Sequence, residues 1–139
     1  MKLLPLLMIM LVAIFQDPST AQQPQATNIA PEPTSMGIII TSNDEETIWN
    51  VLRLANYSIT NGDTVTIFLL GKGVELDGLL LTSSRLKEQV DLFRGNHGSI
   101  LACGTCLQSR NNPNPKQCSI STMGELYDIV RKNKIVLTF

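Results

Sequence analysis

The side chains in this sequence that are best suited to covalent chemistry are its three cysteines, Cys103, Cys106 and Cys118. Cys103 ends a compact apolar run that begins at Ser99, lacks a helical period and is typical of a strand buried on both faces. Gly104 follows, and the pattern then predicts a helix. A thiol at such a junction lies near free backbone N–H groups and the positive end of the helix dipole, which favour the thiolate. We therefore expect Cys103 to be a reactive nucleophile with a lowered pKa.

Three interpretations of the cysteines are open at this point. Cys103 and Cys106 form a C-x-x-C pair at a strand-to-helix junction, as a thioredoxin-like redox pair would, although no tryptophan adjoins the pair and no proline lies within it. Two of the three cysteines can instead form a structural disulfide in an exported protein. All three, with Cys118, can also supply thiolates to zinc or another soft metal. We favour a nucleophilic or redox thiol at Cys103, with no bound metal or other cofactor.

A cysteine–histidine hydrolase is disfavoured by the position of His97, the only histidine. His97 precedes the strand that Cys103 ends, and six residues of strand at about 3.3 Å each separate them by roughly 20 Å. His97 therefore cannot act as the base for Cys103 within one subunit. The sequence also lacks the Gly-x-Ser-x-Gly, His-Glu-x-x-His and Gly-x-Gly-x-x-Gly motifs.

The rest of the chain predicts the elements that position this junction. Apolar runs predict strands at residues 36–41, 64–70, 99–102 and 134–139. Capping residues and apolar spacing predict helices after residues 42–44, after Ser83 or Ser84, near Thr105, and after Ser121 or Thr122. The alternation predicts an α/β fold, a doubly wound, mostly parallel sheet with helices on both faces and the Cys103 strand at its centre.

Apolar positions predict which helix faces are buried. The expected inward residues are Ile48, Val51, Leu52, Ala55 and Ile59 in the first helix, Leu86, Val90 and Phe93 in the second long helix, and Leu126, Ile129 and Val130 in the last. Leu79, Leu80 and Leu81 lie in a predicted loop or short helix. Such an apolar run suggests a contact between subunits.

The amino terminus predicts export. A lysine at position 2 and an apolar stretch of about 13 residues precede small residues at Ser19 and Ala21, as in a signal peptide cleaved after residue 21. Residues 22–35 are rich in proline and polar residues and predict a disordered leader. The folded domain then spans residues 36–139. We expect an exported protein, in a bacterial periplasm, with no membrane association after cleavage.

Composition excludes one broad class of partner. The chain has 139 residues, a formal net charge of −1 and only 5% aromatic residues. Without a basic stripe or aromatic residues for base stacking, nothing predicts binding to nucleic acid.

Three blocks of sequence resemble the DsrE/DsrF family. They are Gly-Ile-Ile-Ile-Thr-Ser-Asn-Asp-x-Glu-Thr-x-Trp-Asn near residue 37, Phe-Leu-Leu-Gly-Lys-Gly-Val-Glu from residue 68, and Ile-Leu-Ala-Cys-Gly-Thr-Cys-Leu-x-Ser-Arg from residue 100, followed by Cys-x-Ile-Ser-Thr-Met. The resemblance covers residues 36–139. It implies a flavodoxin-like sheet, a homotrimer or homohexamer, and sulfur carried as a persulfide, as in DsrE and TusD.

The resemblance also implies roles for individual residues. Cys103 matches the family's sulfur-carrying cysteine, and Arg110 matches the arginine of the helix that follows it. The backbone N–H groups of Gly104, Thr105 and Cys106 are candidate thiolate stabilisers, and Asn43 in the first block is a candidate binding residue. Cys106 and Cys118 have no counterpart in the family's relay motif, and we assign one or the other as a candidate resolving thiol.

The expected function is that of a sulfane-sulfur carrier or sulfurtransferase with a sulfur-donor or sulfur-acceptor protein as partner. The alternative is an accessory protein without turnover that acts through thiol redox chemistry or binds a metal or another ligand.

Overall fold

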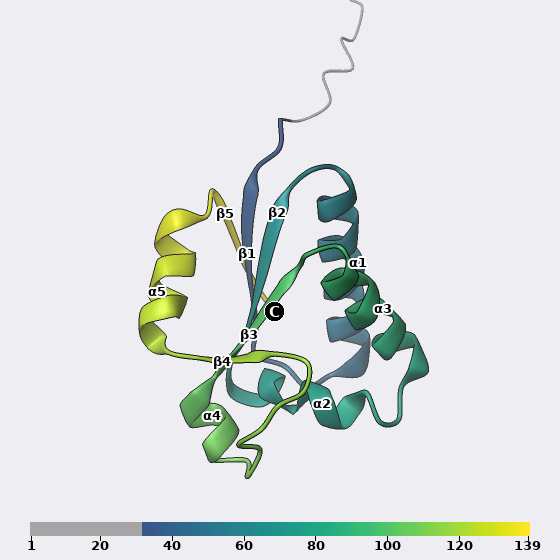
Figure 1. Ribbon diagram of the computed structural model, residues 1–139, viewed down its shortest axis with the longest axis vertical. Helices are drawn as coiled ribbons and strands as arrows, with labels where there is room; N and C mark the ends of the chain where they lie inside the picture. Colours follow the sequence, from purple (N-terminus) through teal and green to yellow (C-terminus); the bar gives the residue numbers. More distant parts are fainter. Residues whose placement is uncertain (1–31) are drawn as a thin grey trace, which may run out of the picture. The chain divides into compact units, whose positions relative to one another are not determined.

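The computed structural model describes residues 32–139, and these form a five-stranded parallel sheet in the order β4-β3-β2-β1-β5 (Figure 1). The strands are β1 (Ser35–Ile40), β2 (Thr64–Leu69), β3 (Ser99–Cys103), β4 (Ser119–Ser121) and β5 (Ile135–Thr138). The predicted signal peptide and residues 22–31 of the predicted leader lie outside the described residues. The α/β class and the parallel sheet are as the sequence predicts.

Helices connect successive strands. They are α1 (Glu45–Thr60), the 3₁₀ helix η1 (Gly71–Glu75), α2 (Leu76–Leu79), α3 (Ser84–Gly95), α4 (Gly104–Gln108) and α5 (Met123–Lys132). In Figure 1, α1 and α3 lie on one side of the sheet and α5 lies on the other, so the sheet is doubly wound as predicted. No helix among residues 32–139 has the length and hydropathy needed to cross a bilayer.

Side-chain caps fix where the three long helices begin. The Asp44 carboxylate accepts the Thr47 N–H at 2.8 Å, and the Ser83 hydroxyl accepts the Leu86 N–H at 3.3 Å. Thr122 forms a capping box with Glu125 before α5. Each cap satisfies a backbone donor that would otherwise have no partner in the first helical turn. The predicted helix starts are therefore confirmed.

The core lies mainly between the sheet and the α1/α3 layer. Its largest fully buried side chains are Phe68, Phe93, Ile38, Ile40, Ile48, Leu52, Ile67, Leu69, Leu86, Leu107 and Val90. The predicted inward residues of α1 and α3 are buried, except Ile59, which packs partly exposed against this core.

Three sequence expectations are wrong. First, the sheet has five strands where we expected four, because β4 pairs with β3. Second, β2 is therefore the central strand, whereas we expected β3 at the centre. Third, Val130 on α5 is 46% exposed, whereas we expected it to face inward. A single helix over that face of the sheet buries a narrow stripe, and Leu126 and Ile129 already fill it.

Parallel pairing brings the carboxyl ends of the inner strands to one edge of the sheet. The segment after β1, the helix η1 after β2 and the helix α4 after β3 therefore lie together at this edge, which is the lower end of the molecule in Figure 1. Ligands of open parallel sheets bind at this kind of edge.

Candidate functional site

Cys103 lies where β3 ends and is the N-cap residue of α4. It is only 4% exposed, because it continues the buried strand and belongs to the main apolar core. A Cβ atom on Gly104 would lie 3.1 Å from the Ile120 side chain. The start of α4 therefore packs tightly against β4, and glycine at position 104 permits this approach.

Burial raises the pKa of the Cys103 thiol, and the adjacent Cys106 thiol raises it further. The N–H groups of Cys106 and Thr105 act in the opposite direction and favour the thiolate, as the sequence predicts, but they do not outweigh desolvation. The expectation of a lowered pKa is therefore wrong. The helix that follows has only five residues and supplies a small dipole.

Cys106 is the more exposed thiol of the pair. It is partly buried, and its Sγ accepts a hydrogen bond from the Gly71 N–H at 3.4 Å. Gly71 has a φ of 56°, a conformation that glycine adopts without strain, and this turn aims its N–H at the sulfur. The loop that follows β2 thus contributes a hydrogen-bond donor to the thiol site.

Cys118 lies apart from the other two cysteines. Leu101 on β3 pairs with Ser119 on β4, so Cys118 lies opposite a position three residues before Cys103. Three residues correspond to roughly 10 Å along the strand direction. A disulfide needs Cα atoms within about 7 Å of each other. Burial, together with the negative charge of Asp77, also raises the pKa of Cys118 to about 11. The geometry of this subunit therefore does not support Cys118 as a resolving thiol.

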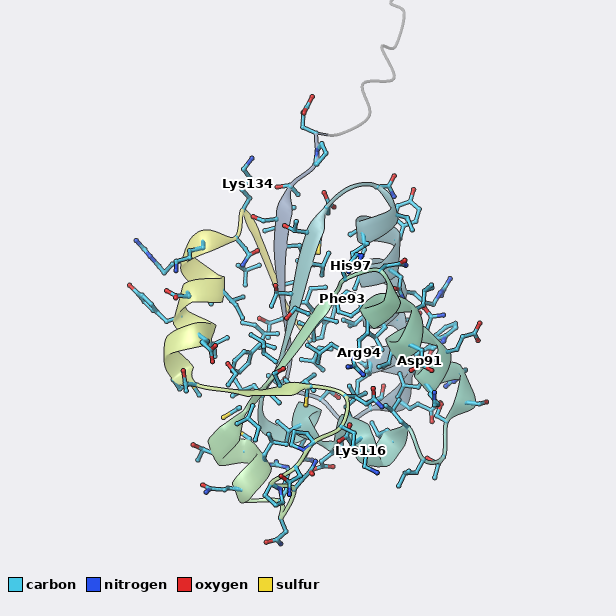
Figure 2. All side chains as sticks on the ribbon, in the orientation of Figure 1. Asp91, Phe93, Arg94, His97, Lys116 and Lys134 are labelled. Carbon is cyan, nitrogen blue, oxygen red and sulfur yellow. The ribbon has the colours of Figure 1, made fainter. Side chains whose placement is uncertain are left out.

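His97 stands at the start of β3, on the turn after α3, while α4 follows the other end of that strand (Figure 2). This agrees with the prediction that His97 is remote from Cys103 within the subunit.

Two predicted binding residues, Asn43 and Arg110, meet through Glu75. The Asn43 amide donates to Glu75 Oε2 at 2.8 Å, and Arg110 Nε donates to Glu75 Oε1 at 2.9 Å. These contacts with Arg110 and Asn43 hold the pKa of Glu75 below its usual value. Arg110 Nη1 also donates to the Cys106 carbonyl at 3.3 Å. The network therefore fixes α4 and its cysteines against η1.

The candidate site residues predicted from the sequence do not include Glu75 or the Gly71 N–H. Both belong to the Phe-Leu-Leu-Gly-Lys-Gly-Val-Glu block, so the sequence contains the signal. Only the fold shows that this block contacts α4.

A cavity of about 570 Å³ lies next to Arg110 and Glu75. Residues of η1, α2 and the segment after α4 form its walls. Leu79, Leu81 and Lys116 line it, but Cys103 and Cys106 do not. The cavity is thus a neighbour of the thiol site and shares Arg110 with it.

The chemistry available at this edge is that of two thiols. Among residues 32–139, no three His, Cys, Asp or Glu side chains are grouped as a metal site requires. Cys103 and Cys106 are the side chains here that can bind a soft ion, exchange a disulfide or carry a sulfur atom.

Five chains of solved structures resemble this one, and two of them illustrate the likeness. The YchN protein of E. coli has 19% sequence identity and a TM-score of 0.64, and the match covers 78% of this chain and 100% of that protein. A conserved protein of unknown function from Bacteroides thetaiotaomicron has 18% identity and a TM-score of 0.64, over 76% of this chain and 95% of that protein.

No protein-family model matches the sequence, and no curated protein matches it significantly. At these identities the structural likeness establishes the fold. It agrees with the flavodoxin-like architecture that the resemblance to DsrE/DsrF proteins implies.

Proposed function

We propose that this protein is an exported carrier of sulfane sulfur, which Cys103 and Cys106 hold as a persulfide. The observation that carries the proposal is the juxtaposition of two interacting thiols of different exposure, one buried and one partly exposed, at the carboxyl edge of the sheet. The resemblance of the Cys103 block to sulfur-relay proteins supports the same chemistry.

Cys106 is the entry thiol in this proposal, because a donor reaches it more easily. Its thiolate attacks the outer sulfur of a donor persulfide, R–S–SH. The donor S–S bond breaks, the donor leaves as a thiolate, and Cys106 becomes the persulfide. This transfer needs no external oxidant or reductant.

Cys103 is the storage thiol. Its thiolate attacks the outer sulfur of the Cys106 persulfide, so that the sulfur passes to Cys103 and the Cys106 thiolate is regenerated. Burial protects the stored sulfur from water and stray thiols, and the N–H groups of Cys106 and Thr105 stabilise negative charge at Cys103. Delivery to the thiolate of an acceptor protein follows the reverse route.

The test is sulfur loading measured by intact mass. Reduced wild-type protein incubated anaerobically with polysulfide should gain the mass of one sulfur atom, which dithiothreitol should remove. The matched control Cys118→Ser should load equally, and Cys106→Ser should load much more slowly. Full loading of a Cys103→Ser/Cys106→Ser double variant would contradict the proposal.

A second candidate is thiol redox chemistry without sulfur transfer, which the three-residue spacing of the two cysteines favours. In this function the Cys106 thiolate attacks a substrate disulfide and releases one substrate thiol. The Cys103 thiolate then attacks the mixed disulfide at the Cys106 sulfur, which forms the Cys103–Cys106 disulfide and releases the second substrate thiol. A protein that forms this disulfide with mild oxidants but never gains sulfur from polysulfide would favour the redox function.

A further inference from the structure

We propose that Cys103 and Cys106 also bind one Cu(I) ion per chain through their two sulfur atoms. This site is independent of the sulfur-carrier function, because the ligands are thiolates and no persulfide takes part. The same pair therefore gives the protein a second class of cargo, a soft monovalent cation.

Local geometry brings the two ligands together. Cys103 is the N-cap of α4 and Cys106 is the third residue of that helix. Side chains three positions apart lie on the same side of a helical turn. Both cysteines also pack against the same apolar core.

The number of ligands favours Cu(I) over zinc. Structural zinc sites use four protein ligands, and catalytic ones use three. The third cysteine, Cys118, stands roughly 10 Å away along the strand direction, so the described fold supplies a two-thiolate site. Soft thiolates select Cu(I), a closed-shell ion that is stable with two sulfur ligands.

The surroundings suit a bound ion of this kind. Cys103 is buried, which keeps water and competing ligands away from the metal. The Gly71 N–H donates to Cys106 Sγ at 3.4 Å, and an outer donor of this type orients a metal-bound thiolate. Cys106 is partly exposed, so an incoming ion can exchange onto it first and then reach Cys103.

Binding changes no oxidation state. Two S–H bonds break, two Cu–S bonds form, and both protons pass to solvent or to the ligand that delivered the ion. The product is a bis-thiolate complex with one net negative charge. Affinity should therefore fall as the solution becomes more acidic.

The test is an anaerobic titration of the reduced protein with Cu(I) in competition with a colorimetric Cu(I) chelator. Wild-type protein should retain one equivalent. Cys103→Ser and Cys106→Ser should each weaken binding by more than roughly 100-fold, because losing a ligand exceeds the 10–100-fold effect of outer-shell changes. The matched control Cys118→Ser should bind like wild type, and circular dichroism should show that each variant is folded.

X-ray absorption of the loaded protein should show two sulfur neighbours around copper. Failure to hold one equivalent against the chelator would overturn the inference, as would equal weakening by Cys118→Ser or a third sulfur neighbour. Protein that gains sulfur from polysulfide but does not retain Cu(I) would refute this site alone. The converse result would refute the carrier function alone.

Discussion

Two cysteines three residues apart differ in exposure because one ends a buried strand and the other lies on the short helix that follows. Cys103 belongs to the core of the sheet, whereas Cys106 faces the turn at Gly71. Sequence position alone suggested that Cys103 would react first. The structure changes that order, because desolvation disfavours a buried thiolate.

Alkylation should depend on both the exposure and the pKa of each thiol. With iodoacetamide at neutral pH, Cys106 should be modified first, because Cys103 is only 4% exposed and the pKa of Cys118 is raised to about 11. The rate at Cys118 should rise with pH until it levels off near pH 11, its raised pKa. Peptide mass spectrometry of briefly treated protein measures each site. Modification of Cys118 at neutral pH as fast as that of Cys106 would contradict the raised pKa of Cys118.

Glu75 should matter for positioning more than for stability. Glu75→Ala removes the acceptor shared by Asn43 and Arg110, so α4 loses its anchor on η1 and sulfur loading should slow several-fold. Urea unfolding should change little, because even this partly buried ion pair remains in contact with solvent, and such pairs contribute little to stability.

The control for Glu75→Ala is Asp128→Ala, which breaks the exposed ion pair with Lys132 on α5. This control should leave loading unchanged. Equal slowing in both variants would show that the effect of Glu75 is unspecific.

At the scale of the elements, η1 is the connection that brings the second sequence block to the thiols. Gly73 lies in η1, and a Cβ atom there would lie 2.2 Å from the Ile40 carbonyl oxygen. Gly73→Ala must therefore push η1 away from β1. We expect a loss of about 1–3 kcal/mol in the free energy of unfolding, the usual cost of overpacking.

Gly78→Ala is the matched control, because nothing lies within 4 Å of a Cβ atom at position 78 in α2. This change should leave stability unchanged or raise it by up to about 1 kcal/mol, the difference in helix propensity. Urea unfolding measures both variants. A Gly73→Ala protein as stable as wild type would contradict the close packing of η1 on β1.

The contact between α1 and α3 should weaken in acid. Hydrogen bonds from Ser83 and Arg85 lower the pKa of Glu45 from its usual 4.5. A lowered carboxyl pKa stabilises the fold above the unfolded-state value, and that stability is lost as pH falls through the folded-state value. Glu45→Gln should therefore reduce the loss of stability below about pH 4.5, measured by urea unfolding across pH. An unchanged pH profile would contradict the role of this contact.

Most elements could be predicted from the sequence, because their signals are local. Asp44 and Ser83 cap helices, and Gly62 stops α1 with a φ of 94°. The three-residue strand β4 has too few residues for a periodic pattern, and only its pairing with β3 defines it. The pKa of Cys103 depends on burial by distant segments, which no local motif reports.

At the scale of the whole molecule, assembly remains a prediction. Leu79 and Leu80 pack against the core, but Leu81 is 88% exposed, so only part of the leucine run is available for a subunit contact. Met123 and Tyr127 on α5 are also exposed. These apolar side chains are compatible with the expected homotrimer or homohexamer.

Light scattering at micromolar concentration should therefore detect a trimer or hexamer. Leu81→Glu should shift the population towards monomer, because it places a charge in the expected contact. The control Leu92→Glu changes an exposed leucine on α3 and should leave the assembly intact. A wild-type protein that is monomeric at these concentrations would refute the expected assembly.

The central claim is that sulfur enters at Cys106 and is stored at Cys103, and site-resolved mass spectrometry over time tests it most directly. Protein mixed with polysulfide is trapped by alkylation at intervals, and the persulfide on each cysteine is quantified. The account predicts persulfide first on Cys106 and then on Cys103, with accumulation confined to Cys106 in Cys103→Ser. Persulfide that appears on Cys118, or on Cys103 at the wild-type rate in Cys106→Ser, would contradict it.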